Sequence, residues 1–372
     1  MLVRNGSAHS VWVKRANTSS TAPRPLRVGL VSSVGGHLKE LLELLPLLVR
    51  CDVFLVLNDE APWLSSESLP AQPVLRRYRI VHAERDLRQL INLGEAAHLL
   101  LRERPDLLIS TGASPAVPFF WLGRALGIRT LFIEDFNLVE QPSLTARLVY
   151  PLAHDFFVQW PQLLSQLPRA RYAGPLFVPA PADSATATTP RSKTVFDAPR
   201  LFVALGTSDR PMTRLLRWLD ELIEKGELAG PVLLQGAIGE YQPRHVRCVP
   251  MLPEPALIES LRHAQRVLCH GGCGVLGTCM KLGRRPIAIP RRADLGEAIN
   301  DHQIMLCRAL SDQGLATLCQ TQADLQAALA QPESPPSPPS VEPAVGSAQG
   351  SLHAAVAQIL STLALEKARR PT

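Results

Sequence analysis

The sequence predicts an α/β protein in which two Rossmann-like domains face each other across a cleft. Short apolar strands alternate with amphipathic stretches, a pattern typical of parallel sheets covered by helices. The pattern is interrupted by a segment rich in Pro, Ala, Ser and Thr and then begins again. The chain has 372 residues, 46% of them hydrophobic, which is enough for two packed domains and too much for one small core.

The first domain is predicted over residues 26–178. Residues 1–25 are polar and mixed, and we expect them to form a flexible leader. Order is expected to begin at Leu26. The apolar runs predict strands at 27–31, 52–57, 107–110 and 131–133.

A second sheet is predicted over residues 200–330, after a linker at 179–199 whose composition cannot form a core. A Pro/Ser-rich tract at 331–350 is expected to act as a second linker. Residues 351–372 include an amphipathic run that predicts a C-terminal helix able to dock on either domain. The strands of this half are expected at 201–205, 231–235, 266–269 and 286–289.

Charge and cysteine content limit the classes of protein that fit. The net charge is +6, but the basic residues are scattered without interleaved aromatics, which disfavours a nucleic-acid groove. Anionic substrates and an anionic membrane surface fit the charge better. Seven cysteines without a repeated spacing indicate reduced thiols in a cytosolic protein. No apolar run approaches membrane-spanning length and no signal-peptide core is evident, so we expect a cytoplasmic location.

The most informative motif is the glycine-rich turn Cys269-His-Gly-Gly-Cys-Gly274. It follows an apolar strand and opens a helix, so backbone N–H groups and the positive helix end can face a phosphate, such as the diphosphate of a sugar nucleotide. Downstream, residues 296–303 supply carboxylate, amide and imidazole groups suited to sugar hydroxyls. A purely structural turn and a zinc site with Cys279 are the alternatives. Zinc is disfavoured because no C-x₂-C pair is present, and core-packing cysteines are the default.

A second glycine turn, Ser32-Ser-Val-Gly-Gly-His37, ends the first predicted strand. His37 would lie at the carboxyl edge of the sheet, where open α/β sheets bind ligands, and a histidine there can act as a base. The alternative is that His37 only caps the following helix. The motif has neither the G-x-G-x-x-G spacing nor a Walker lysine, so hydride and phosphoryl transfer lose support.

The helix expected after His37 is apolar on more than one face. Leu38, Leu41, Leu42 and Leu45 form a core-like stripe, whereas Leu44, Leu47 and Leu48 leave a further apolar face. Packing in the core and contact with lipid are both open at this point. Two weaker candidates, Gly206-Thr207 and Glu134-Asp135, also follow predicted strands and are expected to line the cleft.

The ordered series of motifs resembles a known family over about Leu26 to Leu329. The first half is similar to the membrane-associated subunit, and the second half to the donor-binding subunit, of the eukaryotic two-protein N-acetylglucosaminyltransferase that extends dolichyl-diphosphate-GlcNAc. The paired bacterial exopolysaccharide glycosyltransferases share this plan. The matching segments are Ser33-Val-Gly-Gly-His37 with Glu40, Thr111-Gly-Ala, Pro118-Phe119, Ile133-Glu134, Ser143-Leu144, Val158-Gln-Trp-Pro161, Phe202-Val-Ala-Leu-Gly-Thr207, Gln235-Gly-Ala-Ile-Gly239, His270-Gly-Gly-Cys-Gly274, Pro290-Arg291 and Gly296-Glu297 with Asp301-His-Gln303.

The resemblance implies a glycosyltransferase fold of the B type (GT-B), with the acceptor bound by the first lobe and a UDP-sugar by the second. It implies inverting, metal-independent transfer to a polyprenyl-diphosphate-linked saccharide during surface or exopolysaccharide assembly, with the UDP-sugar as co-substrate and no cofactor. His37 is the expected general base, positioned by Glu134. The expected acceptor-binding residues are Gly35, Gly36, Thr111 and Gly112. The expected donor-binding residues are Gly206, Thr207, Gln235, Gly236, His270, Gly271, Gly272, Gly274, Pro290, Arg291, Glu297, Asp301, His302 and Gln303.

Two departures from the family pattern matter. Relatives commonly carry a ribose-binding glutamate soon after the glycine turn, where this chain has Gly277-Thr278. The family's membrane subunit begins with a spanning helix, and the lack of one here implies peripheral attachment to the inner face of the plasma membrane, with other polysaccharide-assembly enzymes as possible partners. The alternatives are a UDP-GlcNAc 2-epimerase of the same fold and a non-catalytic nucleotide-sugar-binding subunit.

Overall fold

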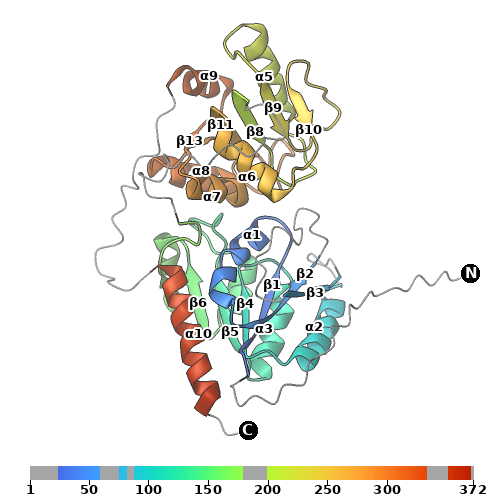
Figure 1. Ribbon diagram of the computed structural model, residues 1–372, viewed down its shortest axis with the longest axis vertical. Helices are drawn as coiled ribbons and strands as arrows, with labels where there is room; N and C mark the ends of the chain where they lie inside the picture. Colours follow the sequence, from blue (N-terminus) through green and yellow to red (C-terminus); the bar gives the residue numbers. More distant parts are fainter. Residues whose placement is uncertain (1–23, 59–74, 82–87, 179–198, 333–350, 370–372) are drawn as a thin grey trace, which may run out of the picture.

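The computed structural model describes residues 24–58, 75–81, 88–178, 199–332 and 351–369. They form two lobes, one above the other in Figure 1. The expected leader at 1–25 and the expected linkers at 179–199 and 331–350 lie almost wholly outside the described residues.

The first lobe is built on a seven-stranded sheet in the order β3-β2-β1-β4-β5-β6-β7, with every pairing parallel. This order contains the 3-2-1-4-5-6 arrangement of a doubly wound fold. The predicted strands are confirmed within one or two residues. The strands are β1 (Arg27–Ser32), β2 (Asp52–Leu57), β3 (Leu75–Arg79), β4 (Leu107–Ser110), β5 (Arg129–Ile133), β6 (Asp155–Val158) and β7 (Arg171–Tyr172).

Helices cover both faces of this sheet. One cluster of buried residues joins a face of the sheet to α1, η1 and α10, and another joins the opposite face to α2 and α3 and to two residues of α4. The helices are α1 (Gly36–Leu42), α2 (Gln89–Glu103), α3 (Ala116–Ala125), α4 (Leu144–Val149) and α10 (Leu352–Arg369), and the 3₁₀ turns are η1 (Leu45–Leu48) and η2 (Pro161–Ser165).

The idea that the helix after His37 faces lipid is wrong. The α-helix ends at Leu42, and Pro46 at the start of η1 marks a change of direction. Leu44 and Leu48 are fully buried in the same core cluster as Leu38 and Leu41, and Leu42 and Leu47 are partly buried against that cluster. The extra apolar residues therefore serve the core on a bent segment rather than an outward face of one straight helix.

The second lobe repeats the plan with a six-stranded parallel sheet in the order β10-β9-β8-β11-β12-β13. Its strands are β8 (Leu201–Ala204), β9 (Val232–Gln235), β10 (Arg247–Val249), β11 (Arg266–His270), β12 (Ile287–Ile289) and β13 (Thr317–Leu318). Its helices are α5 (Thr213–Glu224), α6 (Glu254–His263), α7 (Cys273–Lys281), α8 (His302–Asp312) and α9 (Gln322–Ala330).

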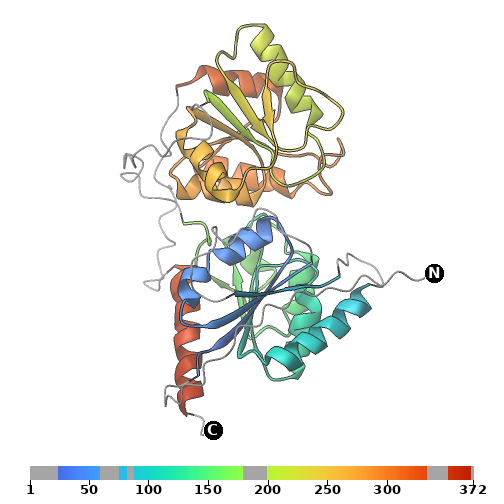
Figure 2. The same cartoon turned by 45° about the vertical axis from the view of Figure 1, so that its right-hand side comes forward.

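The chain returns to the first lobe at its C-terminal helix. Leu352, Val356 and Ile359 of α10 are buried in the core cluster of that lobe, and Lys367 Nζ lies 2.6 Å from Asp106 Oδ2. Figures 1 and 2 both show α10 alongside the first sheet, far from the helices of the second lobe. The helix expected after residue 350 thus docks on the first lobe.

The two lobes share an apolar interface. Phe136, Trp160 and Phe177 of the first lobe belong to the same buried cluster as Phe202 and Leu276 of the second. The Phe136 ring stacks on Trp160 at 5.2 Å and meets Phe177 edge-on at 5.8 Å. In the part of the chain that the structure describes, no helix is both long and apolar enough to cross a bilayer.

Candidate functional site

Both sheets place glycine turns and a histidine at their carboxyl edges. In the first lobe the turn after β1 lies beside the end of β4, and in the second the end of β8 lies beside the turn after β11. These are the positions where the strand order reverses, the usual ligand-binding point of doubly wound sheets. The sequence-predicted residues of each lobe are therefore gathered at one edge.

Thr111 fixes the orientation of His37 by two contacts. The Thr111 hydroxyl donates to the His37 carbonyl oxygen at 2.7 Å, and Nδ1 of the imidazole lies 3.1 Å from the Thr111 carbonyl oxygen. Because a carbonyl only accepts, Nδ1 must carry the proton, and Nε2 of the neutral ring keeps its lone pair. Gly112 has φ of +127°, and a Cβ there would come within 2.9 Å of the His37 ring. A glycine is thus required where the ring packs.

The carboxylate that faces His37 belongs to Asp135, not to Glu134. Asp135 Oδ2 lies 3.6 Å from His37 Nε2. The Glu134 carboxylate instead accepts hydrogen bonds from the Ser143 N–H and hydroxyl and from the Asp135 N–H. The expectation that Glu134 positions His37 is wrong because successive residues after β5 point in different directions. Glu134 holds the start of α4 in place.

Glu134 is fully buried, and burial raises its pKa to about 7, although the hydrogen bonds from Ser143 and Asp135 act in the opposite direction. The group therefore changes protonation near neutral pH while remaining part of the loop that carries Asp135.

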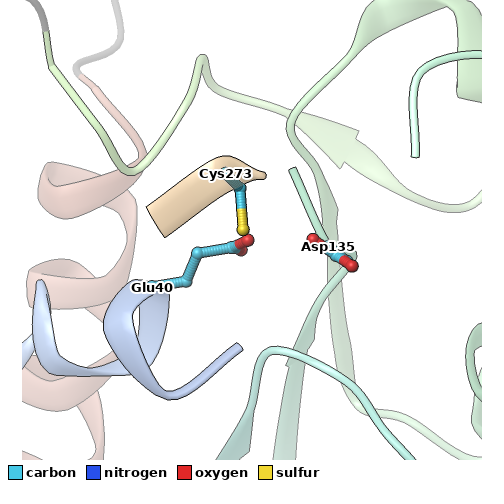
Figure 3. A group of neighbouring side chains, drawn as sticks. All are labelled: Glu40, Asp135 and Cys273. Carbon is cyan, nitrogen blue, oxygen red and sulfur yellow. The ribbon is translucent and has the colours of Figure 1, made fainter. Parts of the chain in front are cut away.

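Glu40, Asp135 and Cys273 meet where the lobes touch (Figure 3). All three are buried, and their potential ligand atoms lie within 4.8 Å of one another. Burial and the nearby Asp135 raise the pKa of Glu40 well above its usual range, and burial likewise raises the pKa of the Cys273 thiol. The cluster joins α1, the end of β5 and the start of α7 across the contact between the lobes. The Glu40 carboxyl also accepts from the Phe136 N–H and from Gln159 Nε2.

His270 is enclosed by two glycines. A Cβ at Gly206, whose φ is +72°, would lie 2.2 Å from Nε2 of the ring, and a Cβ at Gly272 would lie 2.1 Å from Cε1. Nδ1 is buried and has no hydrogen-bond partner among the described residues. Burial, helped by the charge of Arg291, lowers the pKa of His270 to about 3. The ring is therefore neutral at physiological pH and shapes the turn sterically instead of supplying a positive charge.

Arg291 and Glu297, both expected to bind donor, are committed to the protein interior. The Arg291 guanidinium is 1% exposed and donates to the carbonyl oxygens of Leu205, Arg210 and Glu297. The Glu297 carboxylate accepts from Arg214 Nε at 2.9 Å and from Arg214 Nη2 at 3.1 Å. These contacts hold the ends of β8 and β12 together, and neither charged group is presented to a ligand.

Of the other expected donor residues, Thr207, Asp301, His302 and Gln303 are partly or fully exposed, whereas Pro290 is not. Gln303 Oε1 accepts the Arg291 N–H and Asp301 Oδ1 accepts the Ala293 N–H, each at 3.0 Å. Pro290 is buried at the end of β12, and its carbonyl oxygen accepts from Arg214 at 2.7 Å. His302 is partly exposed at the start of α8, and Thr207 is exposed after β8.

Gln235 and Gly236 at the end of β9, and Gly271 in the turn after β11, also lie at the carboxyl edge of the second sheet. Gln235 Nε2 contacts the Met251 sulfur at 2.8 Å, whereas its Oε1 is buried without a hydrogen-bond partner among the described residues. A Cβ at Gly236 would lie 2.5 Å from Leu205 Cβ, and one at Gly271 would lie 2.6 Å from Cys307 Sγ. These glycines allow neighbouring strands and helices to approach closely.

The edge of the first lobe reaches the glycine turn of the second. A Cβ at Gly36 would lie 2.5 Å from Cys273 Sγ, and one at Gly274 would lie 2.9 Å from Lys39 Cδ, so glycines let α1 and α7 approach. Gly35, with φ of +110°, lies opposite Thr207, whose Oγ1 would be 3.8 Å from a Cβ there. The Cys273 N–H donates to Asn137 Oδ1 at 3.2 Å.

Sequence reasoning missed Asn137 and Arg214. Asn137 bridges to the first N–H of α7 from the other lobe, and Arg214 pairs with the buried Glu297. Their local sequences carry no motif. The only signal in the sequence was that Asn137 follows Asp135, a residue expected at the cleft, by two positions. The Gly277-Thr278 departure has a packing reason, since a Cβ at Gly277 would lie 2.4 Å from the Phe177 ring, and the Thr278 hydroxyl donates to the Gly274 carbonyl oxygen.

The fold and the paired glycine turns define the class. The chain has the GT-B fold, as expected. MurG from Acinetobacter baumannii superimposes with a TM-score of 0.55 at 16% identity, covering 94% of this chain and 96% of that one. UDP-GlcNAc 2-epimerase from Methanocaldococcus jannaschii gives 0.60 at 13% identity over 91% and 100%. At these identities the likeness concerns the fold alone.

Part of the first lobe is similar to a known family. Residues 77–176 match the family model described as "Oligosaccharide biosynthesis protein Alg14 like". The UDP-N-acetylglucosamine transferase subunit ALG14 of Eremothecium gossypii is 34% identical over 95 residues, 24% of this chain and 42% of that protein. The human subunit of the same name is 25% identical over 192 residues, 44% of this chain and 89% of its own length. The chain thus spans less than half of the first relative and most of the second.

Proposed function

We propose that the protein is an inverting hexosyltransferase that moves a sugar from a UDP-sugar to a polyprenyl-diphosphate-linked saccharide. The sugar is of the GlcNAc, Glc or GlcA type, and the pathway is surface or exopolysaccharide biosynthesis. The carrying observation is the arrangement of His37, whose Nδ1 faces the Thr111 carbonyl oxygen and whose Nε2 faces Asp135. It lies next to the contact between its own glycine turn and that of the other lobe. The named ALG14 relatives support UDP-N-acetylglucosamine as donor.

In this mechanism the acceptor hydroxyl approaches His37 Nε2 from the cleft. As its oxygen attacks the anomeric carbon, the hydroxyl proton passes to Nε2, the bond from that carbon to the diphosphate oxygen breaks, and UDP leaves with the electron pair. Asp135 then faces an imidazolium, which its carboxylate stabilises. Attack opposite the leaving group inverts the anomeric centre and gives a β-linkage.

The donor diphosphate is assigned to the amides of the glycine turn after β11 and to the N-terminus of α7. Backbone N–H groups and the helix dipole stabilise a diphosphate there without a metal ion. Gly206, Thr207, Gly236 and Gly274 shape the donor side, and Gln303, His302 and Asp301 contact the sugar or nucleotide. Gly35, Gly36, Thr111 and Gly112 shape the acceptor side.

Activity should persist in a chelator such as EDTA. Complete loss that one divalent ion restores would contradict metal independence.

A UDP-GlcNAc 2-epimerase, an enzyme that has the same fold, is one alternative. A non-catalytic nucleotide-sugar-binding subunit is the remaining alternative. Incubation with UDP-sugars and no acceptor separates these possibilities, since an epimerase converts its substrate alone. A transferase converts the UDP-sugar only when a short-chain prenyl-diphosphate-linked N-acetylglucosamine is added, and a binding subunit does neither.

A thermal-shift panel of UDP-sugars tests the donor assignment first, because a ligand that binds only the folded state raises the melting temperature. UDP and at least one UDP-sugar should raise it. No shift with any of them would contradict the proposal.

The proposed location is cytoplasmic, peripheral to the inner face of the plasma membrane.

A further inference from the structure

Apolar side chains gather on the outer surface of three neighbouring helices of the first lobe. Leu90 is 68% exposed and Leu101 61% exposed on α2, Trp121 is 47% exposed on α3, and Leu144 is 50% exposed on α4. α2 packs beside α3 and α3 beside α4. The Trp121 indole N–H donates to the Leu148 carbonyl oxygen at 3.1 Å, which ties the ring to the next helix. Together these residues form an outward apolar surface, called here the α2–α4 face.

The stripe on α2 follows the helical period. Residues 90, 94, 97 and 101 fall on one side of the helix, and they are Leu, Gly, Ala and Leu. The opposite side of α2 is buried in the lobe core through Ala96, Leu99 and Leu100. A solvent-facing side of a surface helix is normally polar, so an apolar one indicates a contact surface.

The fully exposed charged side chains that border this face are arginines. Exposed arginines border the apolar residues: Arg88, Arg102, Arg124 and Arg147. Along the described residues of α2, α3 and α4 the acidic side chains are Glu95 and Glu103. Glu103 is buried and bound to Arg76, and Glu95 accepts the Val81 N–H. The face is thus apolar and cationic, with its carboxylates engaged by the protein.

We infer that the α2–α4 face rests on an anionic lipid bilayer, with Leu90, Trp121 and Leu144 in the interface and the arginines at the phosphate level. Tryptophan prefers the membrane–water interface, and each basic residue near an anionic surface adds attraction. The face takes over the membrane role expected for α1, whose Leu38 and Leu41 are fully buried and whose Leu42 packs against the same core.

The position of the face agrees with a lipid-linked acceptor, and in this respect the inference rests on the proposed function. In a parallel sheet each following helix begins at the carboxyl edge, so α2 and α4 begin beside the edge that carries His37 and Asp135. Leu90 and Leu144 lie in the first turns of those helices. A prenyl chain in the bilayer would therefore leave its sugar close to the base.

The test is co-sedimentation of the full chain with vesicles of phosphatidylcholine, with and without phosphatidylglycerol. We expect binding to the anionic vesicles, and at least about a tenfold lower partition coefficient for Leu90→Glu and Leu144→Glu. Leu365→Glu is the matched control, because Leu365 is 61% exposed but lies on α10, which packs on the opposite side of the sheet from α2, α3 and α4. It should bind as the wild type does.

UDP affinity and the circular dichroism spectrum of each variant show whether the fold and the donor site survive. Unchanged vesicle binding in Leu90→Glu and Leu144→Glu would overturn the inference, even if UDP still binds. An equal loss of vesicle binding in Leu365→Glu would also overturn it. The same holds if the wild type is a dimer that Leu90→Glu and Leu144→Glu convert to monomers while the partition coefficient stays unchanged. Absence of UDP-sugar binding with normal vesicle results would instead count against the proposed function alone.

Trp121 gives a second measurement that does not depend on a charged substitution. Its fluorescence should shift to shorter wavelength when anionic vesicles are added, and that part of the shift should disappear in Trp121→Phe. An identical shift in Trp121→Phe would contradict placement of this face in the bilayer.

Discussion

Nε2 of His37 lies 3.6 Å from Oδ2 of Asp135, on the side of the ring opposite its contact with the Thr111 carbonyl oxygen. The imidazole is therefore held between an acceptor that fixes its proton on Nδ1 and a carboxylate placed to stabilise the imidazolium once Nε2 has taken a proton from the substrate. This is the arrangement required of a base that becomes positively charged during the reaction.

Asp135→Asn should lower kcat by about tenfold or more, because the amide cannot stabilise the imidazolium as a carboxylate does. The KM for the UDP-sugar should change little, since donor binding belongs to the other lobe. Steady-state kinetics with a short-chain prenyl-diphosphate-linked acceptor measures both values. Glu134→Gln is the adjacent control. If it lowers kcat as strongly as Asp135→Asn, the assignment of the two carboxylates is reversed.

Gly272→Ala should destabilise the fold by about 1 to 3 kcal/mol and weaken UDP binding, because the new methyl group meets the His270 ring. The backbone there is not in the left-handed region, so the effect reports the clash alone. The double variant Gly272→Ala/His270→Ala should regain much of the lost stability in chemical denaturation. Gly94→Ala, at an exposed position with open space around it, serves as the control and should be neutral or slightly stabilising. No rescue in the double variant would contradict the packing of His270 on Gly272.

Glu134 gives a pH prediction. Its folded-state pKa of about 7 lies above the usual value of 4.5, so the folded protein binds the proton more tightly than the unfolded chain does. Stability from this group is present below pH 4.5 and is lost as the pH rises through 7, by roughly 3 kcal/mol in all. Glu134→Gln should flatten the curve of unfolding free energy against pH in this window. Parallel curves for the variant and the wild type would show that Glu134 stays ionised.

Glu297→Gln should cost about 3 kcal/mol of stability, because Arg214, whose side chain is only 15% exposed, loses its buried carboxylate partner. UDP affinity of the protein that remains folded should be nearly unchanged. Urea denaturation and calorimetric titration with UDP make the two measurements. Asp294→Asn, which removes a surface partner of Arg292, should change stability little. A large loss of UDP affinity with normal stability in Glu297→Gln would return this residue to the donor site.

Continuous apolar runs and the helical period of 3.6 were sufficient to predict the architecture. Strands such as β1 and β8 are buried on both faces and therefore appear in the sequence as continuous apolar runs. The glycine turns also marked the ligand edges. The division of labour between Glu134 and Asp135 was not predictable, because it depends on which way each side chain leaves the end of β5. The buried contacts of Arg291 and Glu297 were not predictable either, because their partners lie far away in the sequence. Arg291 contacts Arg210 and Leu205, 81 and 86 residues away, and Glu297 contacts Arg214, 83 residues away.

The lipid-facing assignment failed for a related reason. A count of leucines after His37 cannot tell a straight helix with two apolar faces from a bent segment packed under α10. The outward stripe on α2 is visible in the sequence only once its opposite side is known to be buried.

The most direct measurement is the single-turnover rate of His37→Ala, taken with UDP affinity on the same preparation. The rate should fall by roughly a hundredfold or more, the usual effect of removing a positioned general base, while UDP affinity stays within about twofold. Near-normal turnover per folded molecule would contradict the role of His37 and move the base to Asp135 or another carboxylate of the first lobe.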